Sequence, residues 1–387
     1  MDDSFLKSIA ALASVFLLLC LSSCATAPLG SDRGANVTVI HLSPDGSGKR
    51  TGKTQDDAVP LADLQRLIDG ARGATTFRFA DGRYKLEKPI VVRSRAPSHR
   101  LAFEGAGDAV QLEGGYRFRP AERGFAAFRL RTGQVEFRRL RFRHVGACIY
   151  VVRNARAHDV AIQGVTAENV RNCVVADARE GQSIRNWTIS DLTVRGHDKV
   201  AIRIGGPTTR AVRIARIAID GAQDYPQIAC HKVGVEILHG ASDIEISDGL
   251  IENTIGACER YAQGDGVMID DRRSAPSNIR IENLTVRNSR DGNLDLKGVD
   301  VSLHRVVSLP GPQTRYGFRF WRYAYLCDEC VTGAPGKAHV FLRNAQVTFA
   351  DARFDGDASV PRCLKEDASS GGAPSRAVSA PSGADLC

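Results

Sequence analysis

Residues 135–142, VEFRRLRF, place apolar side chains at alternate positions on both sides of a two-residue interruption, Arg138-Arg139. The alternation is typical of a strand with one buried face, and the interruption indicates a bend between two short strands. The pattern returns six times, twice in looser form, at spacings of 22 to 35 residues, which predicts a repeat protein built from stacked β coils. The second apolar residue of each copy lies at positions 137, 162, 189, 214, 246, 281 and 303.

A second set of apolar positions follows most copies and predicts a third short strand in each repeat. Three strands within 22 to 35 residues indicate a solenoid and not alternating β and α units. Asn169, Asn253 and Asn288 each lie two residues after the last apolar position of their repeat. There we expect a stacked ladder that binds the turn backbone. The third strands are expected at residues 148–151, 200–204, 233–237, 266–270, 294–297 and 317–320.

The composition is that of a soluble globular protein, with 43% hydrophobic residues, 25% charged residues and a mean hydropathy of −0.20. These values exclude a polytopic membrane protein and a disordered chain. The net charge of +8 allows an acidic polymer as partner, although a GC-rich genome explains the same excess of Arg. The sequence carries no helix-turn-helix, zinc-finger or RNP motif, so we expect no nucleic acid partner, and we expect a monomer.

The N-terminal residues predict the compartment. Residues 8–19, SIAALASVFLLL, are too few to span a bilayer and fit the apolar region of a signal peptide. Residues 21–24, LSSC, resemble the lipobox of bacterial lipoproteins, which implies a signal peptide over residues 1–24, a lipid on Cys24 and a tether over 25–36. By the same resemblance, Ala25 implies sorting to the outer membrane. We expect the protein on its periplasmic side or at the cell surface, in contact with the membrane through the lipid anchor only.

The segment after the tether carries three further signals. HLSPDGSG occupies residues 41–48, an amphipathic helix is expected at 61–71, and FRFADGRY occupies residues 77–84. This order resembles the opening of the pectate-lyase-like superfamily of right-handed parallel β-helices. A helix suits this place because the end of a stack of coils is apolar and needs a cover. Its expected buried face consists of Leu61, Leu64, Leu67, Ile68 and Ala71.

The resemblance covers residues 37–350 and implies the fold. We expect an all-β, right-handed parallel β-helix solenoid over 101–350, preceded by an N-terminal cap over 37–100. Residues 351–387 form a C-terminal segment whose Ser-, Gly-, Ala- and Pro-rich end predicts a flexible tail. The motif at 327–330, CDEC, lacks a second pair of ligands at zinc spacing, which favours a disulfide or two thiols over a metal site.

Side chains alternate inward and outward along a strand, so aligning the third strands gives the outward columns. Stacked strands lie about 4.8 Å apart, so the members of two neighbouring columns should share one small surface. This surface combines several carboxylates with a Lys and an Arg. The first column holds Arg203, Glu236, Met268, Asp295 and Arg319, and the second holds Gly205, Leu238, Asp270, Lys297 and Trp321.

Two segments of this surface, GDGVMID at 264–270 and DGNLDLK at 291–297, look like polysaccharide lyase site segments. In that family acidic residues hold calcium and a Lys or Arg is the base. The resemblance implies β-elimination at a uronate of an acidic polysaccharide, in which Ca²⁺ or Arg neutralises the substrate carboxylate. The implied calcium ligands are Asp265, Asp270, Asp291 and Asp295; Lys297 is the implied base, with Arg319 as its catalytic partner. Implied substrate-binding residues are Arg203, Glu236, Tyr261 and Trp321.

Three alternatives stay open. A glycoside hydrolase would place two carboxylates, such as Asp270 and Asp295, on either side of one glycosidic bond. An epimerase of a uronate polymer would abstract the same proton as a lyase. A non-catalytic lipoprotein would bind glycan or form an envelope surface, and the charges would then be cross-strand salt bridges on a solvated face.

Overall fold

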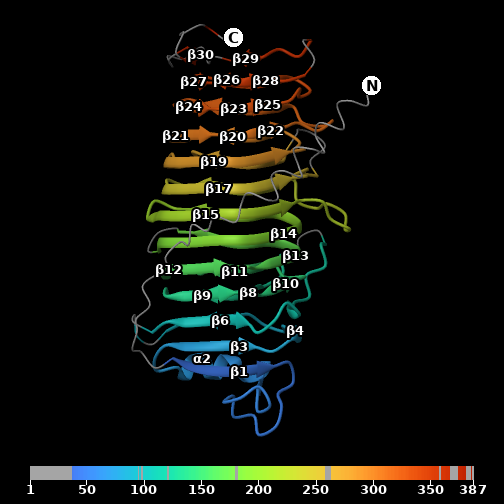
Figure 1. Ribbon diagram of the computed structural model, residues 1–387, viewed down its shortest axis with the longest axis vertical. Helices are drawn as coiled ribbons and strands as arrows, with labels where there is room; N and C mark the ends of the chain where they lie inside the picture. Colours follow the sequence, from blue (N-terminus) through green and yellow to red (C-terminus); the bar gives the residue numbers. More distant parts are fainter. Residues whose placement is uncertain are drawn as a thin grey trace, which may run out of the picture. The chain divides into compact units, whose positions relative to one another are not determined.

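The computed structural model describes residues 37–94, 96, 99–119, 122–178, 182–257, 263–356, 359–366, 374–380 and 385. In these residues the strands stack in parallel, one coil above the next, into an elongated solenoid (Figure 1). Each coil contributes to three sheets that run the length of the stack. The expected all-β parallel β-helix is therefore confirmed.

The first sheet begins with β1 at the N-terminal end and finishes with β30 at the other end (Figure 1). Its strands are β1 (Thr38–Ser43), β3 (Thr75–Phe79), β6 (Leu101–Gly105), β9 (Val135–Arg138), β12 (Arg156–Gln163), β21 (Val299–His304), β24 (Ala324–Asp328), β27 (Gln346–Ala350) and β30 (Arg376–Ala380), and a short strand, β2 (Val59–Pro60), pairs with β1.

The second sheet consists of shorter strands, and the third sheet carries the predicted site. The second contains β4 (Gly82–Lys85), β7 (Val110–Glu113), β10 (Arg141–Arg143), β22 (Val307–Leu309), β25 (Val331–Thr332) and β28 (Arg353–Phe354). The third contains β5 (Ile90–Val92), β8 (Ala126–Leu130), β11 (Ala147–Val151), β16 (Val233–Leu238), β18 (Asp265–Asp270), β20 (Gly292–Leu296), β23 (Tyr316–Trp321), β26 (Ala338–Arg343) and β29 (Cys363–Lys365).

Five long strands turn a corner and belong to more than one sheet. They are β13 (Thr166–Asp177), β14 (Ser183–Gly205), β15 (Thr209–Asp220), β17 (Ser242–Glu252) and β19 (Ser277–Arg287). Of these, β13 and β14 continue into the third sheet, where β13 pairs with β11 and β14 pairs with β16.

The two-residue interruption of the repeat produces the corner between the first and second sheets. Arg139, its second residue in the first copy, has φ of 49°, and Asp191, Arg216 and Asn283 take 55°, 51° and 49° at the same place in later coils. This left-handed conformation reverses the side-chain alternation, so apolar residues before and after the bend both face the interior. The bend expected from the sequence is confirmed.

The interior is a set of apolar columns in register. The second apolar residue of each repeat pairs with its counterpart in the next coil, from Phe137 through Ile162, Ile189, Ile214, Ile246 and Ile281 to Leu303. All seven are at most 1% exposed. Because parallel pairing in register buries both the backbone and these side chains, the alignment of repeats in the sequence predicts which residues become vertical neighbours.

The expected Asn ladder lies at the next corner. The Asn288 side-chain amide donates to Asn253 Oδ1 at 2.6 Å, and the Asn253 amide donates to Asp220 Oδ1 at 2.7 Å. Asn169, Asn253 and Asn288 all have positive φ. The interpretation of these residues as structural is supported by this geometry.

The N-terminal end of the stack carries the expected helical segment, a 3-10 turn η1 (Leu61–Asp63) followed by α2 (Leu64–Gly70). Leu64 and Ile68 are buried in the core, with Leu61, Leu67 and Ala71 packed against it. Among the described residues, no helix is long and apolar enough to cross a membrane.

The stacked strands extend beyond both predicted boundaries. The predicted cap over 37–100 already contains β1, β3, β4 and β5, which pair with the coil above. Beyond residue 350, β29 pairs with β26 and β30 pairs with β27. The expected flexible tail therefore needs correction at 376–380, where a Ser- and Ala-rich segment completes a further coil because its backbone finds an unpaired strand edge.

Candidate functional site

The outer face of the third sheet carries the predicted columns. Register pairs Arg203 with Glu236, Glu236 with Met268, Met268 with Asp295, and Asp295 with Arg319. In the second column Leu238 pairs with Asp270, and the Lys297 N–H donates at 2.9 Å to Ile269 O in the preceding coil. The predicted shared surface is confirmed, whereas the chemical roles of its residues stay predictions.

The strands β20 and β23, with the residues that flank β20, bring Asp291, Asp295, Lys297, Arg319 and Trp321 into one network. Together with Asp265 of β18 and Arg315 we call this network the carboxylate cluster. Lys297 Nζ donates to Asp295 Oδ2 at 2.7 Å, and the Trp321 indole N–H donates to Asp295 Oδ1 at 2.6 Å. Arg319 donates to Asp291 Oδ2 at 2.5 Å and lies 3.7 Å from Asp295 Oδ2. The cluster is therefore held together by its own ion pairs.

The crowding of acids in this cluster changes their protonation. Burial, reinforced by Asp295 and Asp291, raises the pKa of Asp265 to about 8. Burial also raises the pKa of Asp295, but the opposing charges of Arg319 and Lys297 outweigh it, and the net pKa of Asp295 is lowered. At neutral pH the cluster therefore holds a protonated Asp265 next to an ionised Asp295.

The oxygens of the cluster are already engaged by protein donors. Asp291 Oδ1 accepts from Arg315 at 3.0 Å, and Asp265 Oδ1 accepts from the Gly292 N–H at 3.2 Å. Asp270 belongs to a separate pair, since its Oδ2 accepts from Arg272 Nε at 2.5 Å. A calcium ion would need these ion pairs to open, so the described arrangement does not by itself form a cation site, and the calcium assignment stays a prediction.

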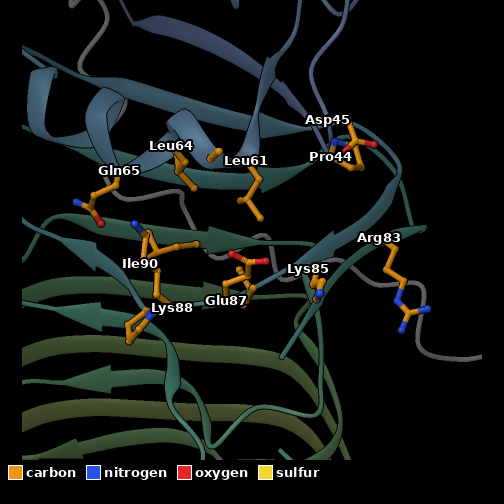
Figure 2. A pocket seen from close by; sticks show the side chains of 13 residues that line it. Pro44, Asp45, Leu61, Leu64, Gln65, Arg83, Lys85, Glu87, Lys88 and Ile90 are labelled. Carbon is orange, nitrogen blue, oxygen red and sulfur yellow. The ribbon is translucent and has the colours of Figure 1, made fainter. Parts of the chain in front are cut away.

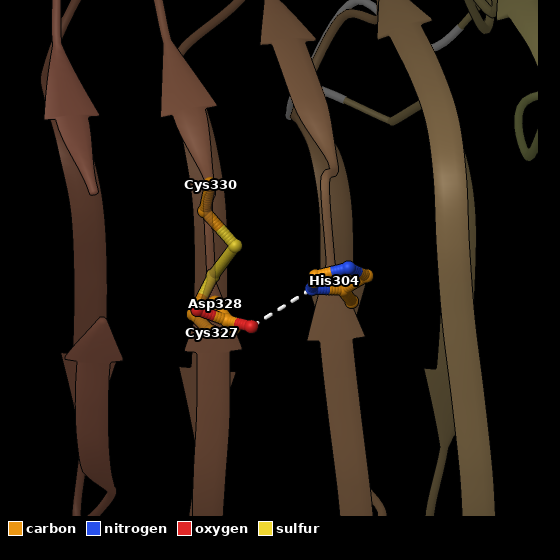
Figure 3. Close-up of a disulfide and its surroundings, with 4 residues drawn as sticks. All are labelled: His304, Cys327, Asp328 and Cys330. Atoms are coloured by element: carbon orange, nitrogen blue, oxygen red, sulfur yellow. Dashed lines mark hydrogen bonds and ion pairs between the residues drawn. A yellow bond between two sulfur atoms is a disulfide. The ribbon is translucent and has the colours of Figure 1, made fainter. Parts of the chain in front are cut away.

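A group of potential metal ligands lies elsewhere, on the first sheet. In the described part of the chain, the one group of three potential ligands whose donor atoms lie within 4.8 Å of one another is His304, Asp328 and Glu329. It adjoins the Cys327–Cys330 disulfide on the first sheet, where His304 Nδ1 lies 2.8 Å from Asp328 Oδ2 (Figure 3). The expectation of a disulfide or two thiols at this motif is confirmed as a disulfide.

Glu236 and Arg203, both predicted to bind substrate, form an ion pair with each other. His231 Nε2 lies 3.2 Å from Glu236 Oε1 on the other side. Burial raises the pKa of Glu236, but His231 and Arg203 together lower it, and the net pKa is about 2. Glu236 is therefore an anion at neutral pH that holds the Arg203 guanidinium in place.

The aromatic residues considered for sugar binding differ in their surroundings. Three cations lie over the Trp321 ring, with Lys297 Nζ 5.2 Å and the guanidinium carbons of Arg319 and Arg343 5.1 Å and 5.5 Å from its centre. Tyr325, a further aromatic residue whose place in the sequence suggests that it could stack on a sugar, is 4% exposed and donates to Leu296 O and Trp321 O, so it cannot do so. Tyr261 and Cys24 lie outside the described residues.

A cavity of about 610 Å³ opens on the same sheet face, over β8, β11, β13 and β14. We call it the basic groove. It lies along the first column, from Arg203 toward the N-terminal end of the stack. None of its lining residues is acidic. Such a volume is typical of ligand sites, and the charge favours an anion. The residues that define it are Arg123, Arg129, Tyr150, Arg171, Lys199 and Arg203.

Four of the cations in the basic groove were not predicted from the sequence. Arg123, Arg129, Arg171 and Lys199 make no side-chain hydrogen bond or ion pair with the residues that the structure describes. Register pairs Arg129 with Tyr150, Tyr150 with Val175, and Val175 with Arg203. Extending the first column toward the N-terminus would therefore have found Arg129.

Lys199 differs electrostatically from the lysine chosen from the sequence. Burial, Arg203 and Arg171 lower the pKa of Lys199, and Arg123 adds to this while Glu236 opposes it. Lys297, in contrast, donates to an ionised carboxylate. The surroundings of Lys199 favour the neutral amine that can accept a proton.

A second cavity, of about 470 Å³, lies at the N-terminal end of the stack. Leu61 and Gln65 of the helical segment, Glu87 and Lys88 of the β4–β5 connection and Ile90 of β5 surround it (Figure 2). Because its lining residues carry charges of both signs, they favour neither an anionic nor a cationic ligand. Pro89 lines both this cavity and the basic groove.

No protein-family model matches the chain, and no curated protein matches it in sequence. Solved structures do match in fold. Pectate lyase Pel9A has a TM-score of 0.54 at 10% identity, covering 83% of this chain and 78% of that chain. An alginate lyase from Paenibacillus sp. str. FPU-7 has a TM-score of 0.54 at 10% identity, covering 86% and 99%. The Azotobacter vinelandii mannuronan C-5 epimerase AlgE6 A-module has a TM-score of 0.54 at 12% identity, covering 83% and 95%.

These likenesses show the fold. The chain is a right-handed parallel β-helix, and the structures named above are those of a pectate lyase, an alginate lyase and a mannuronan epimerase.

Proposed function

We propose that this protein binds an acidic polysaccharide along the outer face of the third sheet and cleaves it by β-elimination at a uronate. The observation that carries this proposal is the basic groove, an open cavity of about 610 Å³ with five cationic side chains and no acidic one. A neutral glycan would gain nothing from these charges, whereas a polymer with a carboxylate on its sugars would be held by them. The fold it shares with lyases and an epimerase adds support.

The reaction requires two things that this face supplies. A base must take the proton beside the carboxylate, and cations must stabilise the charge that then develops on that carboxylate. Lysines and arginines lie together along the sheet, from Arg123 in the basic groove to Arg319 in the carboxylate cluster. Calcium assistance through Asp265, Asp270, Asp291 and Asp295 remains part of the proposal as a separate prediction, because no step described here depends on it.

Hydrolysis is the second candidate. Glycoside hydrolases use one protonated and one ionised carboxyl group, and the raised pKa of Asp265 and the lowered pKa of Asp295 provide such a pair. The predicted pair, Asp270 and Asp295, is less suited because Asp270 is bound by Arg272. We rank hydrolysis second because Asp265 and Asp295 are only 2% and 4% exposed.

The test uses protein lacking residues 1–24 and a panel of uronate polymers, each with added Ca²⁺ and with chelator. We expect an ultraviolet-absorbing unsaturated product together with new reducing ends. Reducing ends without absorbance would support hydrolysis instead. Retention on a polymer column without any product would leave only a binding protein and reject the enzymatic proposal, whereas a loss of product with chelator would support calcium.

We also propose that the protein is a lipoprotein anchored through Cys24 on the periplasmic side of the outer membrane or at the cell surface. The lipobox-like residues 21–24 after an apolar segment support this. Labelled palmitate should enter the wild-type protein but not Cys24→Ser, and the wild type should fractionate with the outer membrane. Equal labelling of both would remove Cys24 as the lipid site.

A further inference from the structure

We propose that the basic groove binds a run of consecutive uronate units, and that Lys199 in it is the base that removes the ring proton. This inference rests on the proposed function but goes further, because it names the subsite, the sequence of charges in the substrate and the reacting side chain. It also moves the base from Lys297 in the carboxylate cluster to a different coil of the solenoid.

The length of the basic groove defines how much polymer it can hold. The groove crosses β8, β11, β13 and β14, which are successive strands of the third sheet. Three steps of about 4.8 Å give a length of about 14 Å, and each step is close to the length of one pyranose unit. A polysaccharide lying along the axis of the solenoid would therefore place about one sugar over each strand.

The positions of these cations favour a polymer with a particular spacing of carboxylates. Arg129 lies on β8, Arg171 on β13 and Arg203 on β14, so the cations recur along the groove. Arg123, Arg129 and Arg171 have no carboxylate partner in the described residues, and their charge is available to a ligand, whereas Lys199 acts as the neutral base. A polymer with a carboxylate on every unit can use all of these charges, whereas an alternating polymer leaves some of them opposite neutral sugars.

Arg203 differs from the other four because Glu236 holds it from behind. That pairing fixes the guanidinium in the cavity that Lys199 also lines, and the Arg203 charge lowers the pKa of Lys199. A fixed cation beside the base suits a reaction in which negative charge grows on the substrate carboxylate, since a preoriented donor needs no rearrangement during the step.

The chemistry balances without a metal or an oxidant. Lys199 takes the proton from C5 of a uronate, and the C5–H electron pair becomes the C4=C5 double bond. The C4–O bond breaks, and its oxygen takes a proton from water; the hydroxide that remains recovers the proton from Lys199. The arginines stabilise the charge on the carboxylate while the proton is in transfer. The lowered pKa of Lys199 supports its role because more of it is neutral near pH 7.

The chain offers a matched control for Lys199. Lys337 directly precedes Ala338, which belongs to the same register column as Val200, the residue after Lys199. Lys337 is exposed and lies outside the basic groove. Lys199→Met and Lys337→Met thus remove the same charge from equivalent positions of different coils. Arg213, exposed on the first sheet, serves in the same way for Arg171.

The experiment measures kcat and KM by absorbance and binding by retention in gels that contain polymer. Polygalacturonate and alginate blocks provide consecutive uronates, hyaluronan provides alternating ones, and single-stranded DNA provides an unrelated polyanion. We expect Lys199→Met to lower kcat at least 100-fold with retention unchanged, because positioned proton transfer is worth about that much or more. Arg171→Ala should raise KM about tenfold, and Lys337→Met and Arg213→Ala should match the wild type.

The pH profile adds a readout that a structural role of Lys199 would not give. The rising limb of kcat/KM should follow deprotonation of Lys199, below the ordinary range of lysine, because burial disfavours the charged amine, Arg203, Arg171 and Arg123 face it, and Glu236 opposes them. Arg203→Ala should move this limb to higher pH, because one of the charges that lower the pKa is then absent.

Two results would overturn the inference while the proposed function stands. One is loss of turnover in Lys297→Met with full turnover in Lys199→Met; the other is equal affinity for hyaluronan, DNA and the consecutive uronates. If no polymer gives product, the proposed function fails, but retention still tests whether the basic groove binds the polymer. Weaker retention of Arg171→Ala than of Arg213→Ala on polygalacturonate or alginate supports the subsite, and equal retention rejects it.

Discussion

At the scale of single residues, the outward columns of the third sheet were predictable and their chemical states were not. A period of two and stacking in register are enough to place Glu236, Asp295 and Arg319 in one column. Whether a lysine in such a column is a base depends on its immediate neighbours. Asp295, two residues earlier in the chain, holds Lys297 in an ion pair at 2.7 Å.

Glu236 gives a prediction about acid stability. Its folded-state pKa of about 2 lies below the ordinary value, so its stabilising effect is complete above about pH 5 and is lost as the pH falls toward 2. The difference between the two pKa values corresponds to about 3 kcal/mol. Glu236→Gln should therefore lower the free energy of unfolding by about that amount at pH 7 and much less near pH 2.

Urea titrations of both proteins between pH 2 and pH 7 measure this difference. His231 remains protonated in both states over the acid part of that range, so its titration does not mask the effect. A difference between wild type and Glu236→Gln that stayed constant with pH would show that Glu236 does not hold its charge in the folded protein.

At the scale of elements, the corners explain both what the sequence revealed and what it concealed. The two-residue interruption marks a left-handed residue in each coil, and the repeat could be aligned through it. The corner before the third sheet is less regular: the pairing of β13 with β14 shifts register between Val170 and Asn172. Arg171 occupies this irregular position, so no regular alternation predicts that it lines the basic groove.

The helical segment could likewise be predicted from the sequence, whereas the terminal strand could not. Leu64 and Ile68 are spaced for one helix face, and both are buried as expected. The strand β30 has no comparable pattern, because its Ser- and Ala-rich segment places only Ala377 in the core and pairs through its backbone with β27. Composition therefore predicted a tail where the preceding coil supplies a partner for strand formation.

At the scale of the whole molecule, charge is distributed along the solenoid axis in a way that the net charge of +8 does not reveal. The third sheet passes from the basic groove at β8 to β14 into the carboxylate cluster at β18 to β23. Each region depends on coils far apart in sequence becoming neighbours. The fold could be predicted because the repeat fixes those neighbours, whereas the cavity depends on loops whose paths the repeat does not determine.

The stack also predicts how the molecule opens. In a linear array each coil is stabilised by its two neighbours, so the terminal coil has less support than the central ones. In native-state hydrogen exchange, we expect amides of Ile214, Ile246 and Ile281 to exchange only on global unfolding and those of β30 to exchange by local opening. Protection of β30 equal to that of the central coils would show that the C-terminal coil is part of one cooperative unit.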